Sequence, residues 1–253
     1  MITHTHAYAA HKKQSTELLD FAVLVCQAVP ELKRAIRVAE KGGEPLAGND
    51  YFGGGRGIEQ LKTYAQRYKS DLAIHITLSS FALFDGYFQQ ACSEVLDFHG
   101  GAERIVGKLR AALLDQEATL SEEEKRDFAT LRDSKKGSKL DSYKKSVGRL
   151  RRGGRFLPSA FFSGHGLVQL ERQLARGIRA YDIPAVMQDC FFFDLGARAA
   201  DFMRIREVRN KLAHSERTTR ALPTAMNDAK TLRDIVVKFD AYVVKHLFVI
   251  EWP

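Results

Sequence analysis

The stretch HITLSSFALFDGYFQQACSEVL, His75–Leu96, lies in the middle of a run from residue 58 to residue 99 that contains no proline. Apolar residues recur in this run at a spacing of three or four, at Leu61, Tyr64, Tyr68, Leu72, Ile76, Phe84, Phe88 and Cys92. That spacing places them along one face of a helix. Gly100 and Gly101 follow, as glycines do at helix ends. The run predicts one long helix or two in close succession.

The same periodicity predicts helices on both sides of this run. They cover residues 16–40, with a kink or restart at Pro30, then 102–114, a segment starting after Ser121, 167–181, 185–214 and 225–249. A glycine-rich loop separates the first helix from residue 58. No segment alternates apolar and polar residues over the length of a strand. The expected fold class is therefore all-α.

The composition indicates a protein of a reducing compartment that carries excess positive charge. The chain has 253 residues and a net charge of +8, which makes a polyanion the first partner to consider. Cys26, Cys92 and Cys190 lie far apart, without the spacing of a zinc site or a disulfide framework. We find no export signal and no membrane-spanning stretch. We expect a cytoplasmic protein without metal or cofactor, whose first residues, including His4, His6 and His11, form a disordered tail.

Positive charge is concentrated between residues 133 and 156, inside a segment of about 115–165 that we interpret as an insertion. The cations of this basic segment face only Asp133 and Asp141, and they are Lys135, Lys136, Lys139, Lys144, Lys145, Arg149, Arg151, Arg152 and Arg155. One interpretation is a solvated, flexible insertion. The other is an arm that binds the phosphates of a nucleic acid.

The sequence RNKLAH, Arg209–His214, ends the helix expected over 185–214. At 100° per residue, Arg209, Asn210 and His214 occupy one arc of about 140°, which also contains Arg206, next to an apolar face. Asn210 and His214 are four positions apart and therefore neighbours on the helix surface. The simplest interpretation is the polar face of an amphipathic helix. The alternative is a site that combines a cation, an amide and an imidazole.

An arginine, a polar residue directly after it and a histidine five positions beyond the arginine resemble the signature of the HEPN superfamily. His75–Leu96 is similar to the first core helix of the HEPN bundle, in which an acidic residue often faces this motif, and Asp85 matches that position. The resemblance covers residues 60–100 and 185–250. It implies a HEPN-like helical domain over 58–253, preceded by an N-terminal helical extension and glycine-rich loop over 1–57. Within the superfamily the chain resembles stand-alone bacterial ribonucleases of toxin–antitoxin and anti-phage defence systems.

The resemblance implies metal-independent cleavage of RNA to 2′,3′-cyclic phosphate products. His214 would transfer protons, Arg209 would bind the phosphate, Asn210 would orient His214 or donate to the phosphate, and Asp85 would hold Arg209. HEPN nucleases place the motifs of two protomers across one cleft, so a homodimer is implied. Further RNA contacts are expected from Arg206, Lys135, Lys136, Lys144, Lys145, Arg149, Arg151 and Arg152.

Two other functions stay open. One is a non-catalytic HEPN-like module that binds nucleic acid or a partner protein, and an antitoxin or other regulatory partner fits either function. The other is a DNA-binding regulator, which would need a helix-turn-helix that the sequence does not show. Some HEPN toxins carry a tyrosine shortly after the histidine that an antitoxin modifies, whereas HSERTT follows here, so control by that route is not expected.

Overall fold

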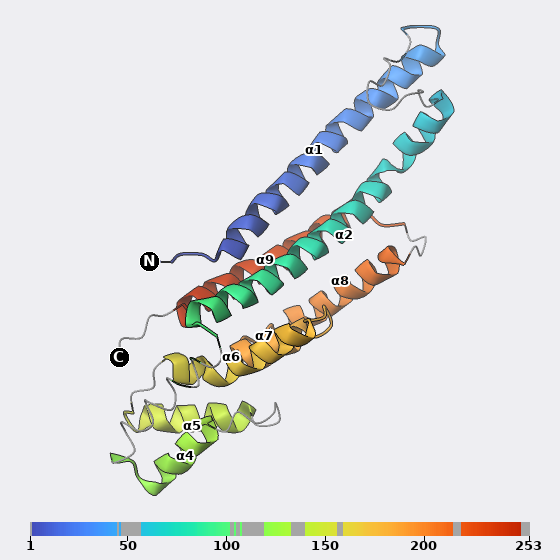
Figure 1. The fold of residues 1–253 in the computed structure, drawn as a ribbon. Coiled ribbons are helices and arrows are strands. Elements are labelled where there is room, and N and C mark those ends of the chain that lie inside the picture. The colour runs from blue at the N-terminus through green and yellow to red at the C-terminus, as the bar shows by residue number, and fades with distance from the viewer. Residues whose placement is uncertain are drawn as a thin grey trace. The chain divides into compact units, whose positions relative to one another are not determined.

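The computed structural model describes residues 2–44, 46, 57–101, 104, 107, 119–132, 140–155, 159–214 and 219–248. All regular secondary structure in these ranges is helical, which confirms the all-α class (Figure 1). The helices are α1 (His6–Glu40), α2 (Ile58–His99), α4 (Glu122–Arg132), α5 (Leu140–Arg152), α6 (Ser159–Arg176), α7 (Ile183–Phe191), α8 (Arg198–Ala213) and α9 (Leu222–His246). Among the described helices, none combines the length and apolar character needed to cross a membrane.

The chain divides into two compact units, each assembled from separated segments. Unit 1 comprises Met1–Ala10, Asp85–Met203 and Asp234–Pro253. Unit 2 comprises His11–Phe84 and Arg204–Arg233. The boundary expected between residues 57 and 58 stays a prediction.

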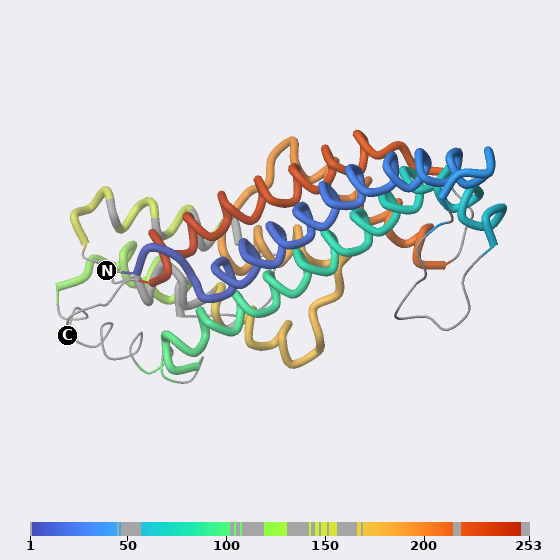
Figure 2. The backbone as a smooth tube through the Cα atoms, turned by 90° about the horizontal axis from the view of Figure 1, so that it is seen from above, coloured from blue at the N-terminus to red at the C-terminus, as the bar shows by residue number. Residues whose placement is uncertain are grey.

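Unit 2 is held together by apolar residues from α1, α2 and α9. Its core cluster contains Ala22, Leu72, Ala73, Ile76 and Ala225, all with less than a tenth of their surface exposed. Figures 1 and 2 show α1 and α2 side by side. Burying a side chain such as Leu72 or Ile76 stabilises a fold by about 1.5–3 kcal/mol. The periodic apolar face of residues 58–99 therefore packs as its spacing indicates.

Unit 1 has an aromatic core centred on Phe239 of α9. The rings of Phe88, Phe191 and Phe193 have centroids within 5.5 Å of the Phe239 centroid. Phe192, between Phe191 and Phe193 in the sequence, has a left-handed backbone with φ 56° and ends α7. The single helix expected over 185–214 is thus wrong, because residues 192–197 separate α7 from α8. The chain turns there so that the rings on both sides of Phe192 reach Phe239.

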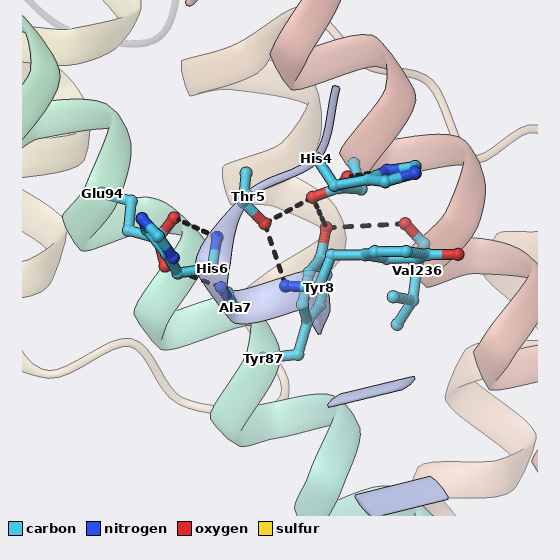
Figure 3. Close-up of polar contacts among 9 residues, drawn as sticks. His4, Thr5, His6, Ala7, Tyr8, Tyr87, Glu94 and Val236 are labelled. Carbon is cyan, nitrogen blue, oxygen red and sulfur yellow. Dashed lines mark hydrogen bonds and ion pairs between the residues drawn. The ribbon is translucent and has the colours of Figure 1, made fainter. Parts of the chain in front are cut away.

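The first residues are anchored in unit 1 and are not the disordered tail expected from the sequence (Figure 3). The Thr5 hydroxyl donates to Asp240 at 2.5 Å and accepts the Tyr8 N–H at 3.0 Å, which makes Thr5 the N-cap of α1. The Glu94 carboxylate accepts the N–H groups of His6 and Ala7 at 2.8 and 2.7 Å. Together, the two side chains satisfy backbone donors that a helix start leaves without partners.

Two further helix boundaries differ from the sequence expectations. Pro30 lies inside α1, which is one helix from His6 to Glu40 and does not restart. Proline removes one backbone hydrogen bond from a helix interior, and α1 continues through it with Ala22 buried before Pro30 and Ile36 buried after it. α6 begins at Ser159, eight residues before the expected start at residue 167. The helix expected over 102–114 lies almost entirely outside the described residues.

Candidate functional site on α8

The last turns of α8 carry the arginine, asparagine and histidine in an ordered arrangement. α8 has Asp201 in its first turn and Lys211 in its last, which suits the helix dipole. Glu207 and Lys211 form an i, i+4 ion pair at 2.9 Å. The helix ends at Ala213, and the His214 N–H still donates to the Asn210 carbonyl oxygen at 3.0 Å. His214 is therefore positioned by the helical hydrogen-bond pattern although it lies just past the helix.

Arg209 is half-buried, and it is held by two neighbours. Its Nη1 donates to the Oδ1 atom of Asn210 at 3.0 Å. Its guanidinium carbon lies 5.4 Å from the ring centroid of Phe81, a core residue of α2 with 1% of its surface exposed. A guanidinium above an aromatic face is a stabilising cation–π arrangement. Within the described part of the chain no other side chain accepts from Arg209, so its remaining N–H groups can bind an anion.

The contacts of Asn210 bear on the role of its side chain, for which the sequence left two possibilities open. The Oδ1 atom of Asn210 is engaged by Arg209, which leaves its side-chain NH₂ group as the donor for another ligand. The His214 side chain is exposed, one turn further along the same face. Two roles were expected for Asn210, and donation from its NH₂ group to a phosphate fits this geometry. The Oδ1 atom of Asn210 also orients Arg209.

The other residues expected at the site lie on α8 and α2. Arg206 is half-buried, one turn before Asn210. Asp85 is half-buried on α2, one turn after Phe81. Asp85 belongs to unit 1 and Arg209 to unit 2, so the pairing of Asp85 with Arg209 stays a prediction.

A buried carboxylate that the sequence analysis missed holds α8 within unit 2 through Arg204, in the middle of the helix. Asp228 of α9, 3% exposed, accepts from Arg204 of α8 at 2.8 Å and forms an ion pair with Arg220. The backbone N–H of Arg220 donates to the Ser70 hydroxyl of α2 at 3.3 Å. These contacts tie α8, α9 and α2 together. No local sequence signal distinguishes Asp228 from any other helical aspartate.

The described part of the basic segment is helical and anchored by ion pairs. Asp127 of α4 accepts from Ser146 at 2.9 Å and from Arg149 Nε at 2.8 Å. Arg155 donates to Glu124 at 2.6 and 2.8 Å. The Arg149 guanidinium lowers the pKa of Asp127, and that of Arg155 lowers the pKa of Glu124 to about 2. Residues 140–152 therefore form a helix that is held to α4, and both interpretations of the basic segment stay predictions.

The residues of this segment expected to bind RNA divide into three groups. Lys145 and Arg152 are exposed on α5, and the Arg152 Nε donates to the nearby Gly148 carbonyl oxygen at 3.2 Å. Arg149 is exposed but ion-paired with Asp127. Lys144 and Arg151 lie on α5 with side chains outside the described set, and Lys135 and Lys136 lie outside the described residues. Of the α5 side chains that the structure describes, Lys145 and Arg152 are thus the candidates for phosphate contacts.

Comparisons with protein-family models, with curated proteins and with solved structures found no match for this chain. In the part of the chain that the structure describes, no cluster of three or more histidine, cysteine or acidic side chains is arranged to hold a metal ion.

Proposed function

We propose that the protein is a metal-independent endoribonuclease with a HEPN-like helical bundle. The observation that carries this proposal is the end of α8, where Asn210 and Phe81 hold the Arg209 guanidinium and leave N–H groups for an anion, next to an exposed His214. A scaffold has no need to place a cation, an amide donor and an imidazole together on one accessible face.

These groups match the demands of RNA cleavage by the neighbouring 2′-hydroxyl. The 2′-oxygen attacks phosphorus while a base removes its proton, and the bond from phosphorus to the 5′-oxygen breaks while an acid protonates that oxygen. The products are a 2′,3′-cyclic phosphate and a 5′-hydroxyl. His214 is assigned to transfer a proton, because histidine is the side chain most often used as a general acid or base. Arg209 and the Asn210 NH₂ group stabilise the negative charge that develops on the phosphoryl oxygens.

One copy of the site offers one imidazole, whereas the reaction uses an acid and a base. We propose that two copies of the chain supply one His214 each to a shared cleft in a twofold dimer. Asp85 is assigned to hold Arg209, and Arg206, Lys145 and Arg152 to bind flanking phosphates. A nuclease of this kind suits a toxin–antitoxin or anti-phage defence system, in which a partner protein restrains it.

The test is incubation of purified protein with total RNA in EDTA. Wild type is expected to cleave and to leave 2′,3′-cyclic phosphate ends, while Arg209→Ala and His214→Ala are expected to be inactive. His6→Ala serves as the matched control, because the His6 side chain is also exposed and the backbone N–H of His6, which donates to Glu94, is kept in the variant. Equal cleavage by all variants would refute the assignment. Binding of RNA without cleavage by wild type would favour the non-catalytic module instead.

A further inference from the structure

The part of α1 that lies in unit 2, from His11 onward, presents an apolar stripe to solvent. Phe21, Leu24 and Val38 are exposed over 49%, 61% and 47% of their surface. Ala28 and Ala35 are also exposed. These five residues, named here the α1 stripe, follow the alternating spacing of three and four that is typical of a helix pairing with another helix. Glu31 occupies the remaining position of the pattern.

A groove of about 430 Å³ runs between α1 and α2 beside this stripe. Phe21 belongs to both features, and Val25, Val29 and Leu32 of α1 form one wall of the groove. Tyr64, Tyr68 and His75 are among the α2 residues on the other side. A helix lying along the α1 stripe would cover the mouth of this groove and remove both apolar surfaces from water.

Charged residues beside the stripe change sign along α1. One flank carries Asp20, Gln27 and Arg34 of α1 and then Lys41, the residue directly after the helix, at intervals of seven, and all four are exposed. The acidic residue stands at the beginning of the stripe and the two cations at its end. A surface with this polarity is complementary to a copy of itself turned end for end.

We propose that a second copy of this chain docks on the α1 stripe, with the two α1 helices antiparallel. In the register that aligns both stripes, Phe21 packs against Val38 of the second copy and Leu24 against Ala35. Asp20 then lies opposite Lys41 of the second copy, and Gln27 lies opposite Arg34. A parallel pair would place no opposite charges across the stripe. Glu31 lies opposite Ala28, so this one polar residue disfavours other registers.

This association goes beyond the proposed nuclease activity and does not depend on it. It uses only α1 and the groove beside it, and no residue of α8 takes part. The experiments below contain no RNA, so their failure leaves the nuclease proposal unchanged.

Site-specific cross-linking tests the orientation of the pair. Cys26→Ala removes the one cysteine that is not buried, and single cysteines are then introduced as Ala28→Cys or Val38→Cys. A short thiol cross-linker is expected to join two Ala28→Cys copies, because those positions lie near the twofold axis. It is not expected to join two Val38→Cys copies, which lie 17 positions apart along an antiparallel pair, about 25 Å at 1.5 Å per residue. Joining at both positions, or at neither, would overturn the proposal.

Leu24→Glu tests the apolar contact. It is expected to reduce cross-linking of the Ala28→Cys protein at least tenfold. Val23→Glu is the matched control, since Val23 is 56% exposed on the same helix but lies outside the stripe. Circular dichroism checks that both variants keep their helix content. An equal loss in both variants, or in neither, would contradict docking on the α1 stripe.

A charge exchange tests the register without touching the apolar residues. Asp20→Lys or Lys41→Asp alone places like charges opposite each other twice in a twofold pair, and each is expected to weaken association by about tenfold. The double variant restores opposite charges and is expected to cross-link through Ala28→Cys as fully as the protein with native charges, a readout that association through α8 does not change. A double variant as weak as the single ones would overturn the proposed register.

Discussion

The end of α8 and the contacts around Asp240 use similar polar side chains in opposite ways. Asp240 has 0% of its surface exposed and is contacted by Thr5, by the Tyr87 hydroxyl at 3.5 Å and by His4 Nδ1 at 3.3 Å (Figure 3). Arg209 is half-buried and His214 is exposed, and both have donors available to a ligand. A buried polar group lowers stability unless it forms a hydrogen bond within the protein. An accessible polar group is hydrated and can exchange its water for a ligand.

Under the proposed function, this difference separates polar residues that stabilise the fold from polar residues that act on RNA. Loss of a group around Asp240 should lower the free energy of unfolding and leave the chemistry intact. Loss of a group at the end of α8 should slow RNA cleavage and leave the free energy of unfolding nearly unchanged. The comparison can be tested with conservative substitutions that change one function of each residue.

The largest effect is expected from His214→Gln. Glutamine keeps hydrogen-bonding capacity but cannot transfer protons at neutral pH, so the rate of RNA cleavage should fall by a factor of about 10² to 10⁴. The free energy of unfolding should change by less than about 0.5 kcal/mol, because the side chain is exposed. Single-turnover cleavage and urea denaturation give the two values. A large loss of stability would mean that His214 is a structural residue.

Asp240→Asn should give the opposite result. The amide group turns one acceptor of Asp240 into a donor and removes the charge, so Thr5 and Tyr87 lose part of their hydrogen bonding inside the core. The free energy of unfolding should fall by about 3 kcal/mol. At a temperature where the variant remains folded, its cleavage rate should match wild type. Reduced cleavage with unchanged stability would place Asp240 in the functional machinery.

A third effect concerns His11, which is 5% exposed in α1. Burial and, to a lesser extent, the positive charge of Arg233 lower the pKa of His11 to about 4. Between that value and about 6.5 the unfolded chain binds a proton at His11 that the folded chain does not, so stability falls as the pH falls. Lowering the pH from 7 to 5 should cost wild type about 2 kcal/mol more than His11→Gln. Parallel pH dependence of the two proteins in urea denaturation would contradict this.

The smallest effect is expected from Phe81→Leu. Leucine keeps an apolar core residue but removes the ring that Arg209 contacts, an interaction of about 0.5–1 kcal/mol. RNA cleavage should fall about threefold beyond any effect of lower stability. Phe88→Leu is the control, because Phe88 is as deeply buried on the same helix and packs against Phe191 and Phe239. Equal cleavage losses in the two variants would mean that the Phe81 ring does not position Arg209.

Local patterns were sufficient to predict much of the fold. The spacing of Leu72, Ile76 and Phe88 predicted α2, and the structure buries all three residues. The helix expected over 185–214 failed because its break depends on Phe239, which lies far along the chain and draws Phe191 and Phe193 toward it. The start of α1 was missed for a similar reason, since Glu94 of α2 and Asp240 of α9 anchor it.

The candidate site shows the same division. Helical spacing predicted that Arg209, Asn210 and His214 share one face, because neighbours on a helix follow from the sequence alone. Helical spacing did not predict that Phe81 lies under Arg209, because these residues are more than 100 positions apart. It also did not predict that Asp228 pairs with Arg204 and Arg220, because that role of Asp228 depends on its burial.

The sequence by itself determined the helical class, the apolar face of α2 and the grouping of polar residues at the end of α8. Each of these depends on residues within a few turns of one another, whose geometry the helix fixes. Only the tertiary structure decided which polar groups are buried and paired, as at Asp240 and Asp228, and which stay accessible, as at His214. The physical reason is that burial depends on which distant segments pack together, and removal from water determines whether a polar group must find its partner within the protein.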